Sequence, residues 1–264
     1  MLQSEGEKAG RLDQYLKELH LPTVRSCYQE EAINARRDSW DYETYLYELV
    51  ARESEDRQNN RIARLLRESR LPLEKSLKAF DRKRLPRKVD AQLSLLLKGD
   101  FLDHKENVLA FGNPGSGKTH LLCAIGQELT YHGRQVRFTP CSLLVQELLI
   151  AKRELKLARV LKQYGKYEAL IIDDIGYVQQ SREEMEVLFT LLADRYERSS
   201  IMISSNLPFS KWEQIFKDPM TTAAAIDRLV HHSVILELNL SSYRLEQSRK
   251  STKTVVGQSA QAEP

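Results

Sequence analysis

Eight consecutive residues have the types and spacing of a loop that binds phosphate. They are Gly112, Asn113, Pro114, Gly115, Ser116, Gly117, Lys118 and Thr119. They follow an apolar run, residues 108–111, and open a helical pattern, which is the strand–loop–helix setting that such a loop requires. Glycines let the backbone wrap closely, so that its N–H groups and the helix N-terminus point at phosphate oxygens. We therefore expect Lys118 to reach the outer phosphates of ATP and Thr119 to ligate Mg²⁺.

Two other interpretations of this loop are weaker. The glycines fall as G-x-x-G-x-G, which fits a dinucleotide-binding fingerprint poorly. A glycine-rich turn after a strand is the structural alternative. His120, the next residue, joins the predicted nucleotide-binding segment by its position, although packing of the helix would also explain it.

Two carboxylates follow a second apolar run, residues 169–172. In an open parallel sheet this run would end at the carboxyl edge, where ligands bind. We assign Asp173 to Mg²⁺, directly or through water, and Asp174 to the attacking water of hydrolysis. A pair of turn or helix-capping aspartates is the alternative.

A third run, residues 201–206, ends in Ser204, Ser205 and Asn206. We expect its strand to lie between the phosphate strand and the Asp173 strand, so that its end faces the γ-phosphate. Asn206 is then the first candidate to hold the attacking water, with Ser204 or Ser205 as second choices. A turn at Asn206-Leu207-Pro208 is the alternative.

Alternating strands and helices must position these groups. Short apolar runs predict strands at residues 107–111, 135–139, 169–172, 201–204 and 234–238, and helical patterns fill residues 121–131, 143–164, 183–197 and 221–230. This alternation predicts an α/β fold with a five-stranded parallel sheet covered on both faces. The extra strand between the phosphate loop and Asp173 favours the AAA+ and RecA-like branch of P-loop ATPases.

The segments on either side differ in character. Residues 11–97 contain no glycine and have apolar residues at helical spacing, which predicts three to five helices and no strand, with Pro22, Pro72 and Pro86 near helix ends. We expect an α-helical region at 1–98, the ATPase core at 99–248 and a polar, disordered tail at 249–264.

Together these segments resemble the IstB-like AAA+ ATPases, the transposition helpers of insertion sequences, which are related to DnaC-type helicase loaders. The resemblance covers nearly the whole chain. The segments that carry it are residues 61–71, 104–109, 117–121, 170–174, 227–231 and 242–245.

The resemblance implies a bacterial cytoplasmic ATPase that forms a homo-oligomer through its ATP interfaces, assembles on duplex DNA and activates a partner transposase. It also implies that Arg228 reaches the ATP of a neighbouring subunit, since an arginine suits a γ-phosphate; a solvent-facing helix arginine is the alternative. The chain departs from the wider AAA+ pattern in two ways. First, few residues follow the last strand, so a full C-terminal helical lid does not fit and Arg244 is only a weak candidate for the second sensor arginine. Second, Asp174 stands where many relatives have glutamate.

Basic residues gather between Arg57 and Lys88. Twelve of them face only three acidic residues, an excess of nine positive charges (12 minus 3). We predict contacts with the DNA backbone, without base-specific contacts, for Arg57, Arg61, Arg64, Arg67, Arg70, Arg82, Lys83, Arg84, Arg87 and Lys88. A solvated helix surface is the alternative.

The remaining features narrow the class of protein. The net charge of +3 says little about partners, and three cysteines without metal spacing favour a reducing cytoplasm. No apolar run is long enough to span a bilayer. His231-His232 lacks further ligands nearby in sequence, so we interpret the pair as structural. Rival functions are a helicase loader, a small-molecule kinase and a non-catalytic adaptor that uses ATP as an assembly switch.

Overall fold

The computed structural model describes residues 5–176, 181–213 and 219–243, and the chain divides into two compact units, residues 1–64 and 65–264. The boundary that we expected at residue 98 does not coincide with this division. Leu71, Leu85 and Leu93 lie in the hydrophobic core of the larger unit. Helical spacing shows that a face is apolar, but it does not show what that face packs against. The predicted tail at 249–264 lies outside the described residues.

The smaller unit consists of α1 (Glu5–Glu18), α2 (Pro22–Arg37) and the part of α3 (Tyr42–Ser69) up to Arg64. Its small core is formed by Leu16, Val24 and Leu49. Pro22 is at the first position of α2, where its missing N–H costs nothing. The described part of residues 11–97 contains helices and no strand, as predicted.

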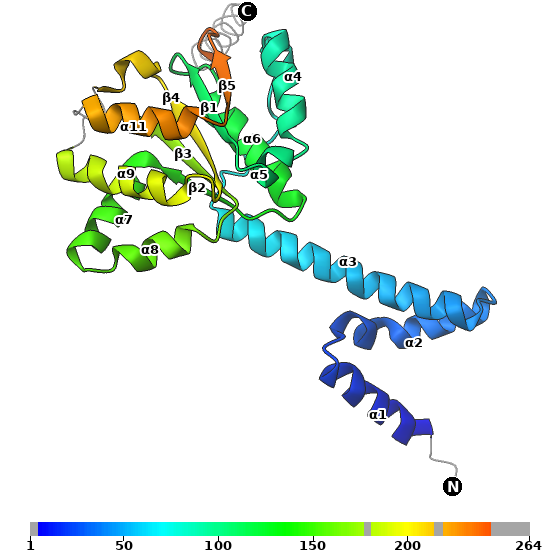
Figure 1. Ribbon diagram of the computed structural model, residues 1–264. Helices are drawn as coiled ribbons and strands as arrows, with labels where there is room; N and C mark the ends of the chain where they lie inside the picture. Colours follow the sequence, from blue (N-terminus) through cyan, green and yellow to red (C-terminus); the bar gives the residue numbers. More distant parts are fainter. Residues whose placement is uncertain (1–4, 177–180, 214–218, 244–264) are drawn as a thin grey trace, which may run out of the picture. The chain divides into compact units, whose positions relative to one another are not determined.

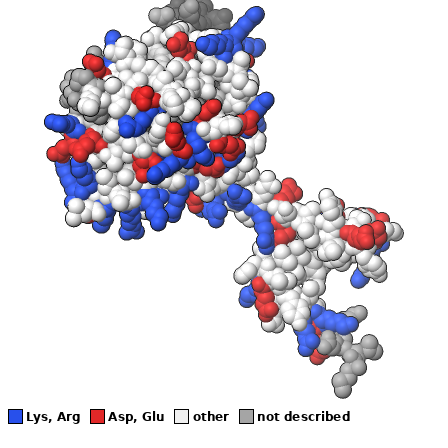
Figure 2. Space-filling model, viewed as in Figure 1, with Lys and Arg blue, Asp and Glu red and all other residues white. Residues whose placement is uncertain are grey.

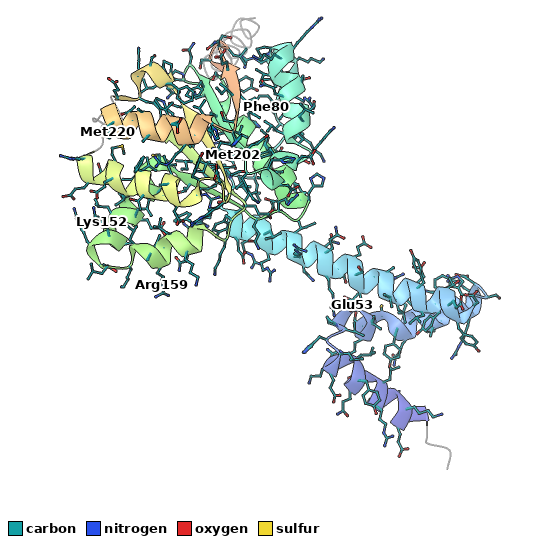
Figure 3. The ribbon with its side chains drawn as sticks, in the orientation of Figure 1. Glu53, Phe80, Lys152, Arg159, Met202 and Met220 are labelled. Carbon is teal, nitrogen blue, oxygen red and sulfur yellow. The ribbon has the colours of Figure 1, made fainter. Side chains whose placement is uncertain are left out.

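Glu53 of α3 caps the start of α2 (Figure 3). Leu21, the residue before α2, has no side-chain acceptor, and the Glu53 carboxylate accepts instead from the Thr23 and Val24 amides at 2.9 and 3.1 Å. The Arg57 Nε donates to the same carboxylate at 2.8 Å. Burial raises the pKa of Glu53, but the hydrogen bonds from Arg57 and the two amides outweigh it, so the pKa lies below its ordinary value.

Replacing Glu53 by alanine should destabilise the smaller unit by about 1 to 3 kcal/mol, because two helix-end amides lose their buried acceptor. Hydrogen exchange across residues 5–64 of the full chain would measure the loss. Glu55→Ala, at an exposed position of the same helix, is the matched control. The pKa of Glu53 is lower in the folded state than in the unfolded state. Its contribution to the stability of the smaller unit is therefore fully present above the unfolded-state pKa and is lost as the pH falls through the folded-state pKa. Equal protection in the two variants at neutral pH would contradict the assignment.

The larger unit is built on a five-stranded parallel sheet in the order β2-β3-β4-β1-β5. Its strands are β1 (Asn107–Gly112), β2 (Val136–Pro140), β3 (Ala169–Ile175), β4 (Ser200–Ser205) and β5 (Ser233–Leu238). All five predicted strands are present, and β4 lies between β1 and β3 as expected. The carboxyl ends of β1, β3 and β4 therefore meet at one edge of the sheet.

Helices cover both faces of this sheet (Figure 1). One face packs against α4 (Arg87–Leu96), α5 (Asp100–Asp103) and α6 (Lys118–Tyr131), and the other against α7 (Cys141–Arg153), α8 (Leu157–Tyr164), α9 (Arg182–Arg195) and α11 (Pro219–Val230). Alternate strand residues point to opposite faces, so Leu109 and Ile172 lie in one core and Val108 and Ile171 in the other. Burial on both faces explains why the strands read as continuous apolar runs.

The predicted helix at residues 143–164 is wrong as a single element. The chain forms α7 and α8, and Leu155 between them has a φ of 57° and a side chain that is 94% exposed. A leucine rarely adopts this left-handed conformation, and no glycine or proline marks the break. Two short 3₁₀ helices, η1 (Arg82–Arg84) and η2 (Phe209–Lys211), complete the described elements. No helix within the described ranges is long and apolar enough to cross a membrane.

Candidate nucleotide-binding site

The loop between β1 and α6 has the backbone conformation that its glycines allow. Gly115 and Gly117 have φ values of 79° and 98°, and Gly117 is the residue before α6. The N-terminus of a 14-residue helix therefore opens directly from the loop. A Cβ atom on Gly112 would lie 2.2 Å from the Leu238 carbonyl oxygen of β5, so close packing of the two strand ends excludes any side chain there.

Lys118 is held at the mouth of this loop. Its Nζ donates to the carbonyl oxygens of Gly112 and Asn113 at 2.9 and 3.0 Å and to Asn206 Oδ1 at 2.5 Å. The residue is only 4% exposed. Asn206, predicted to hold the attacking water, thus also contacts the predicted phosphate-binding lysine. The structure brings these two residues together from the start of α6 and the end of β4.

Thr119 and Asp173 are also adjacent, as their predicted shared role requires. The Thr119 hydroxyl donates to Asp173 Oδ1 at 2.7 Å, and the Ser204 hydroxyl donates to the same oxygen at 2.6 Å. Asp173 is half-buried and Ser204 is fully buried. The hydroxyl of α6 and the carboxylate of β3 therefore meet beside the phosphate loop.

Ser204 contacts both predicted carboxylate residues. Besides donating to Asp173, its Oγ accepts from the backbone N–H of Asp174 at 2.8 Å. Asp174 is exposed, has a φ of 57° and lines the cavity next to the loop. One buried hydroxyl thus holds Asp173 by its side chain and Asp174 by its backbone. The sequence suggested Ser204 only as a second choice for holding water, because a serine at a strand end carries no sign of its partners.

The cavity beside the loop has a volume of about 230 Å³. One wall is the phosphate loop, and the other contains residues of the segment 75–84, which the sequence did not link to the nucleotide. Phe80 of this segment packs edge-on against His120, with ring centroids 5.1 Å apart, and His120 Nε2 lies 2.9 Å from the Ser76 carbonyl oxygen. His120 therefore packs against this segment and also lines the cavity, and its contact with the nucleotide stays a prediction. Phe80 has no motif around it, and an aromatic residue within a strongly charged segment is the only signal.

The end of the described chain closes the same cavity. Leu240 and Tyr243 line it, and the Tyr243 backbone N–H donates to the Gly115 carbonyl at 3.0 Å. Arg84 donates to the Ser241 carbonyl at 3.0 Å, and its guanidinium lies 5.2 Å from the Tyr243 ring centroid. Arg84, expected to contact DNA, is thus part of the cavity wall. Arg244 lies outside the described residues.

The other predicted DNA contacts occupy varied surroundings. Arg57 pairs with Glu53 and also donates to the His20 carbonyl, and Arg82 pairs with Asp90 at 2.7 Å. The exposed members of the set are Arg57, Arg61, Arg64, Arg67, Arg70, Lys83, Arg87 and Lys88.

Arg228 is not among the residues that line the cavity of its own chain. It lies on α11, where Nη1 donates to the Ala224 carbonyl at 3.1 Å and the guanidinium lies 5.0 Å from the Phe189 ring centroid of α9. A role at the phosphates of the same chain therefore has no support in this geometry.

Relatives of this chain are found among bacterial insertion-sequence proteins. It is 42% identical over 235 residues to a candidate ATP-binding protein of an insertion sequence in Sinorhizobium fredii, covering 89% of this chain and 79% of that protein. It is 36% identical over 239 residues to a candidate ATP-binding protein of an insertion sequence in Geobacillus stearothermophilus, covering 90% of this chain and 95% of that protein.

Solved structures share its fold. AMPPCP-bound DnaA from Aquifex aeolicus matches with a TM-score of 0.55 and 19% identity, over 70% of this chain and 56% of that one. DnaI matches with a TM-score of 0.51 and 21% identity, over 64% of this chain and 94% of the DnaI chain. The core is therefore an AAA+ P-loop fold. The family model of the IstB-like ATP binding protein matches residues 14–251, and together with the relatives it shows that this chain belongs to the IstB-like family of ATP-binding proteins.

Proposed function

We propose that this protein is an ATPase that assembles on target DNA and activates the transposase of an insertion sequence. The observation that carries the proposal is the group of Thr119, Asp173, Ser204 and Asp174 beside the phosphate loop. The insertion-sequence relatives, at 36 and 42% identity, favour transposition over helicase loading. Co-purification with a transposase from the same insertion sequence or with a replicative helicase would separate the two partners.

The residues present fit a magnesium nucleotide. Hydroxyl and carboxylate oxygens are the ligands that Mg²⁺ prefers, so Thr119 and Asp173 would hold it, and it would neutralise charge on the phosphates. Lys118 and the N-terminus of α6 would stabilise the outer phosphates.

Hydrolysis needs a base for the attacking water. The Asp174 carboxylate would take a proton from the water as its oxygen bonds to the γ-phosphorus and the bond to the β-phosphate oxygen breaks. Asn206 would orient that water. The products are ADP and inorganic phosphate.

Replacing Ser204 by alanine should lower kcat about 10- to 100-fold and change ATP affinity far less. The variant removes a buried hydrogen bond to Asp173 and leaves the Asp174 N–H without its acceptor, a loss of roughly 1 to 3 kcal/mol. Steady-state ATPase assays with nucleotide-binding titrations would measure both quantities. Ser205→Ala is the matched control, because Ser205 is equally buried but contacts Ile175 and Leu207. An unchanged kcat in Ser204→Ala would exclude the positioning role.

Basic surfaces of the larger unit are candidates for the DNA backbone. The predicted segment contributes the exposed Arg67 and Arg70. Lys and Arg side chains also gather along the edge formed by α7 and α8 (Figure 2), and Arg159 lies on the outer side of α8 (Figure 3). We define the α8 basic surface as Arg159, Lys162 and Lys166, all exposed.

Removing charge from these surfaces should weaken DNA binding equally for all sequences. The two double variants to test are Arg67→Ala/Arg70→Ala and Arg159→Ala/Lys162→Ala. The logarithm of the DNA-binding constant falls with the logarithm of the salt concentration, and each double variant should make this slope shallower by about two, one for each lost phosphate contact. Fluorescence anisotropy with duplexes of different sequence would measure this. Lys152→Ala/Lys156→Ala is the control, since both lysines form ion pairs with glutamates. Slopes equal to that of the wild type in both test variants would exclude these surfaces.

One experiment tests the function as a whole: ATPase rate and particle size measured together, with and without duplex DNA. We expect ATP-dependent assembly on DNA and turnover that DNA changes. Assembly without turnover would favour the adaptor, and phosphate transfer to a nucleotide or sugar would favour a kinase.

A further inference from the structure

A second group of side chains with ligand chemistry lies far from the nucleotide site. Glu197, His231 and His232 each place one ligand atom within 4.8 Å of those of the other two. Glu197 follows α9, and the two histidines lie between α11 and β5. Because β4 and β5 begin just after these turns, the group lies at the edge of the sheet opposite the phosphate loop.

The main chain that carries these ligands is tied together by one buried residue, Asn107. Its backbone N–H donates to the His232 carbonyl at 2.7 Å, and its Nδ2 donates to the Leu229 carbonyl at 3.1 Å. Its Oδ1 accepts from the Ile201 N–H at 2.9 Å. The α9–β4 and α11–β5 turns are therefore both anchored to the start of β1. These hydrogen bonds position the main chain at His232 and at Ile201 near the start of β4, four residues after Glu197.

The surroundings of the histidines also suit coordination. His231 Nδ1 lies 3.2 Å from the Tyr196 hydroxyl, which leaves Nε2 for another partner. A hydrogen bond to one ring nitrogen is how metal-binding histidines are usually oriented. The His231 and His232 ring centroids are 4.1 Å apart, and all three candidate ligand residues are exposed, so an ion can reach them.

We propose that Glu197, His231 and His232 bind a divalent transition-metal ion of the zinc class. Two imidazoles and one carboxylate select such an ion over Mg²⁺ or Ca²⁺, which prefer oxygen ligands, and they leave a coordination position for water. The sequence alone led us to interpret the two histidines as structural. Glu197 is distant along the chain, and only the fold brings it to them.

The bound ion would join the end of α9 to the turn after α11. These two helices also meet where the Arg228 guanidinium lies over the Phe189 ring. The ion would therefore restrain the helix that carries Arg228. The site itself does not depend on ATP hydrolysis or on DNA binding.

Calorimetric titration of the full chain with ZnCl₂ in excess Mg²⁺ tests the proposal. We expect one saturable site, a rise in Tm on zinc addition, and at least about tenfold weaker binding in His232→Ala and in Glu197→Gln, since each removes one of three ligands. Asp173→Asn should bind zinc like the wild type, and this result would exclude the nucleotide site as the place where zinc binds. His104→Ala, at an exposed histidine outside the group, should do the same.

The outcomes separate clearly. Absence of a saturable site, or affinity unchanged in both ligand variants, overturns the proposal. If His232→Ala fails to fold, Glu197→Gln still decides, because it changes only an exposed side chain in a turn. Weakening by His104→Ala to the same extent would identify nonspecific surface binding and would also overturn it.

Discussion

Lys118→Ala should weaken ATP binding at least about 100-fold and abolish ATP-dependent assembly on duplex DNA. In the folded chain the Lys118 Nζ is buried and held by three oxygens at the mouth of the phosphate loop. Charge-assisted hydrogen bonds contribute roughly 1.5 to 3 kcal/mol each, and two to the outer phosphates account for a loss of this size. Titration with ATP and particle sizing with and without DNA would measure both effects.

Lys98→Ala is the control for this variant, because it removes the same charge from an exposed position. Circular dichroism would confirm that both variants fold. Assembly on DNA that is undiminished in Lys118→Ala would show that ATP does not drive it, and the proposed function would then be wrong.

Arg228→Ala should lower ATP turnover by about 1,000-fold or more while leaving ATP affinity within roughly threefold of the wild type. An arginine supplied to the γ-phosphate from a neighbouring subunit acts on the transition state, which is why rate and affinity separate. Arg228 does not line the cavity of its own chain, which supports action on a neighbour. Arg198→Ala, an exposed arginine after the adjacent helix α9, is the control.

Mixing the two inactive variants tests the action between subunits directly. Lys118→Ala retains Arg228 but binds ATP weakly, whereas Arg228→Ala binds ATP but lacks the arginine. A mixture forms some interfaces with both groups intact, so turnover should rise well above that of either variant alone. If the mixture stays inactive although both variants enter one particle, Arg228 acts within its own chain or only in folding.

Burial raises the pKa of Cys123 on α6 to about 12, so its thiol stays protonated at neutral pH. It is therefore a packing residue and not a nucleophile.

The features that the sequence alone predicted depend on short segments of chain. The phosphate loop, the five strands and the adjacency of Thr119 and Asp173 follow from local spacing and from the rule that parallel strands end at one edge. The position of β4 between β1 and β3 was also predicted, whereas the full strand order comes from the structure.

What only the tertiary structure decided involves residues distant in sequence. Ser204 acquires its contacts with Asp173 and Asp174 when β3 pairs with β4, and Phe80 reaches His120 only through the packing of residues 75–84. Glu197 likewise reaches the two histidines through the folding of two separate turns. Spacing along the chain encodes the conformation of a segment, but these contacts depend on which segments pack together. Packing of the whole hydrophobic core determines which segments meet.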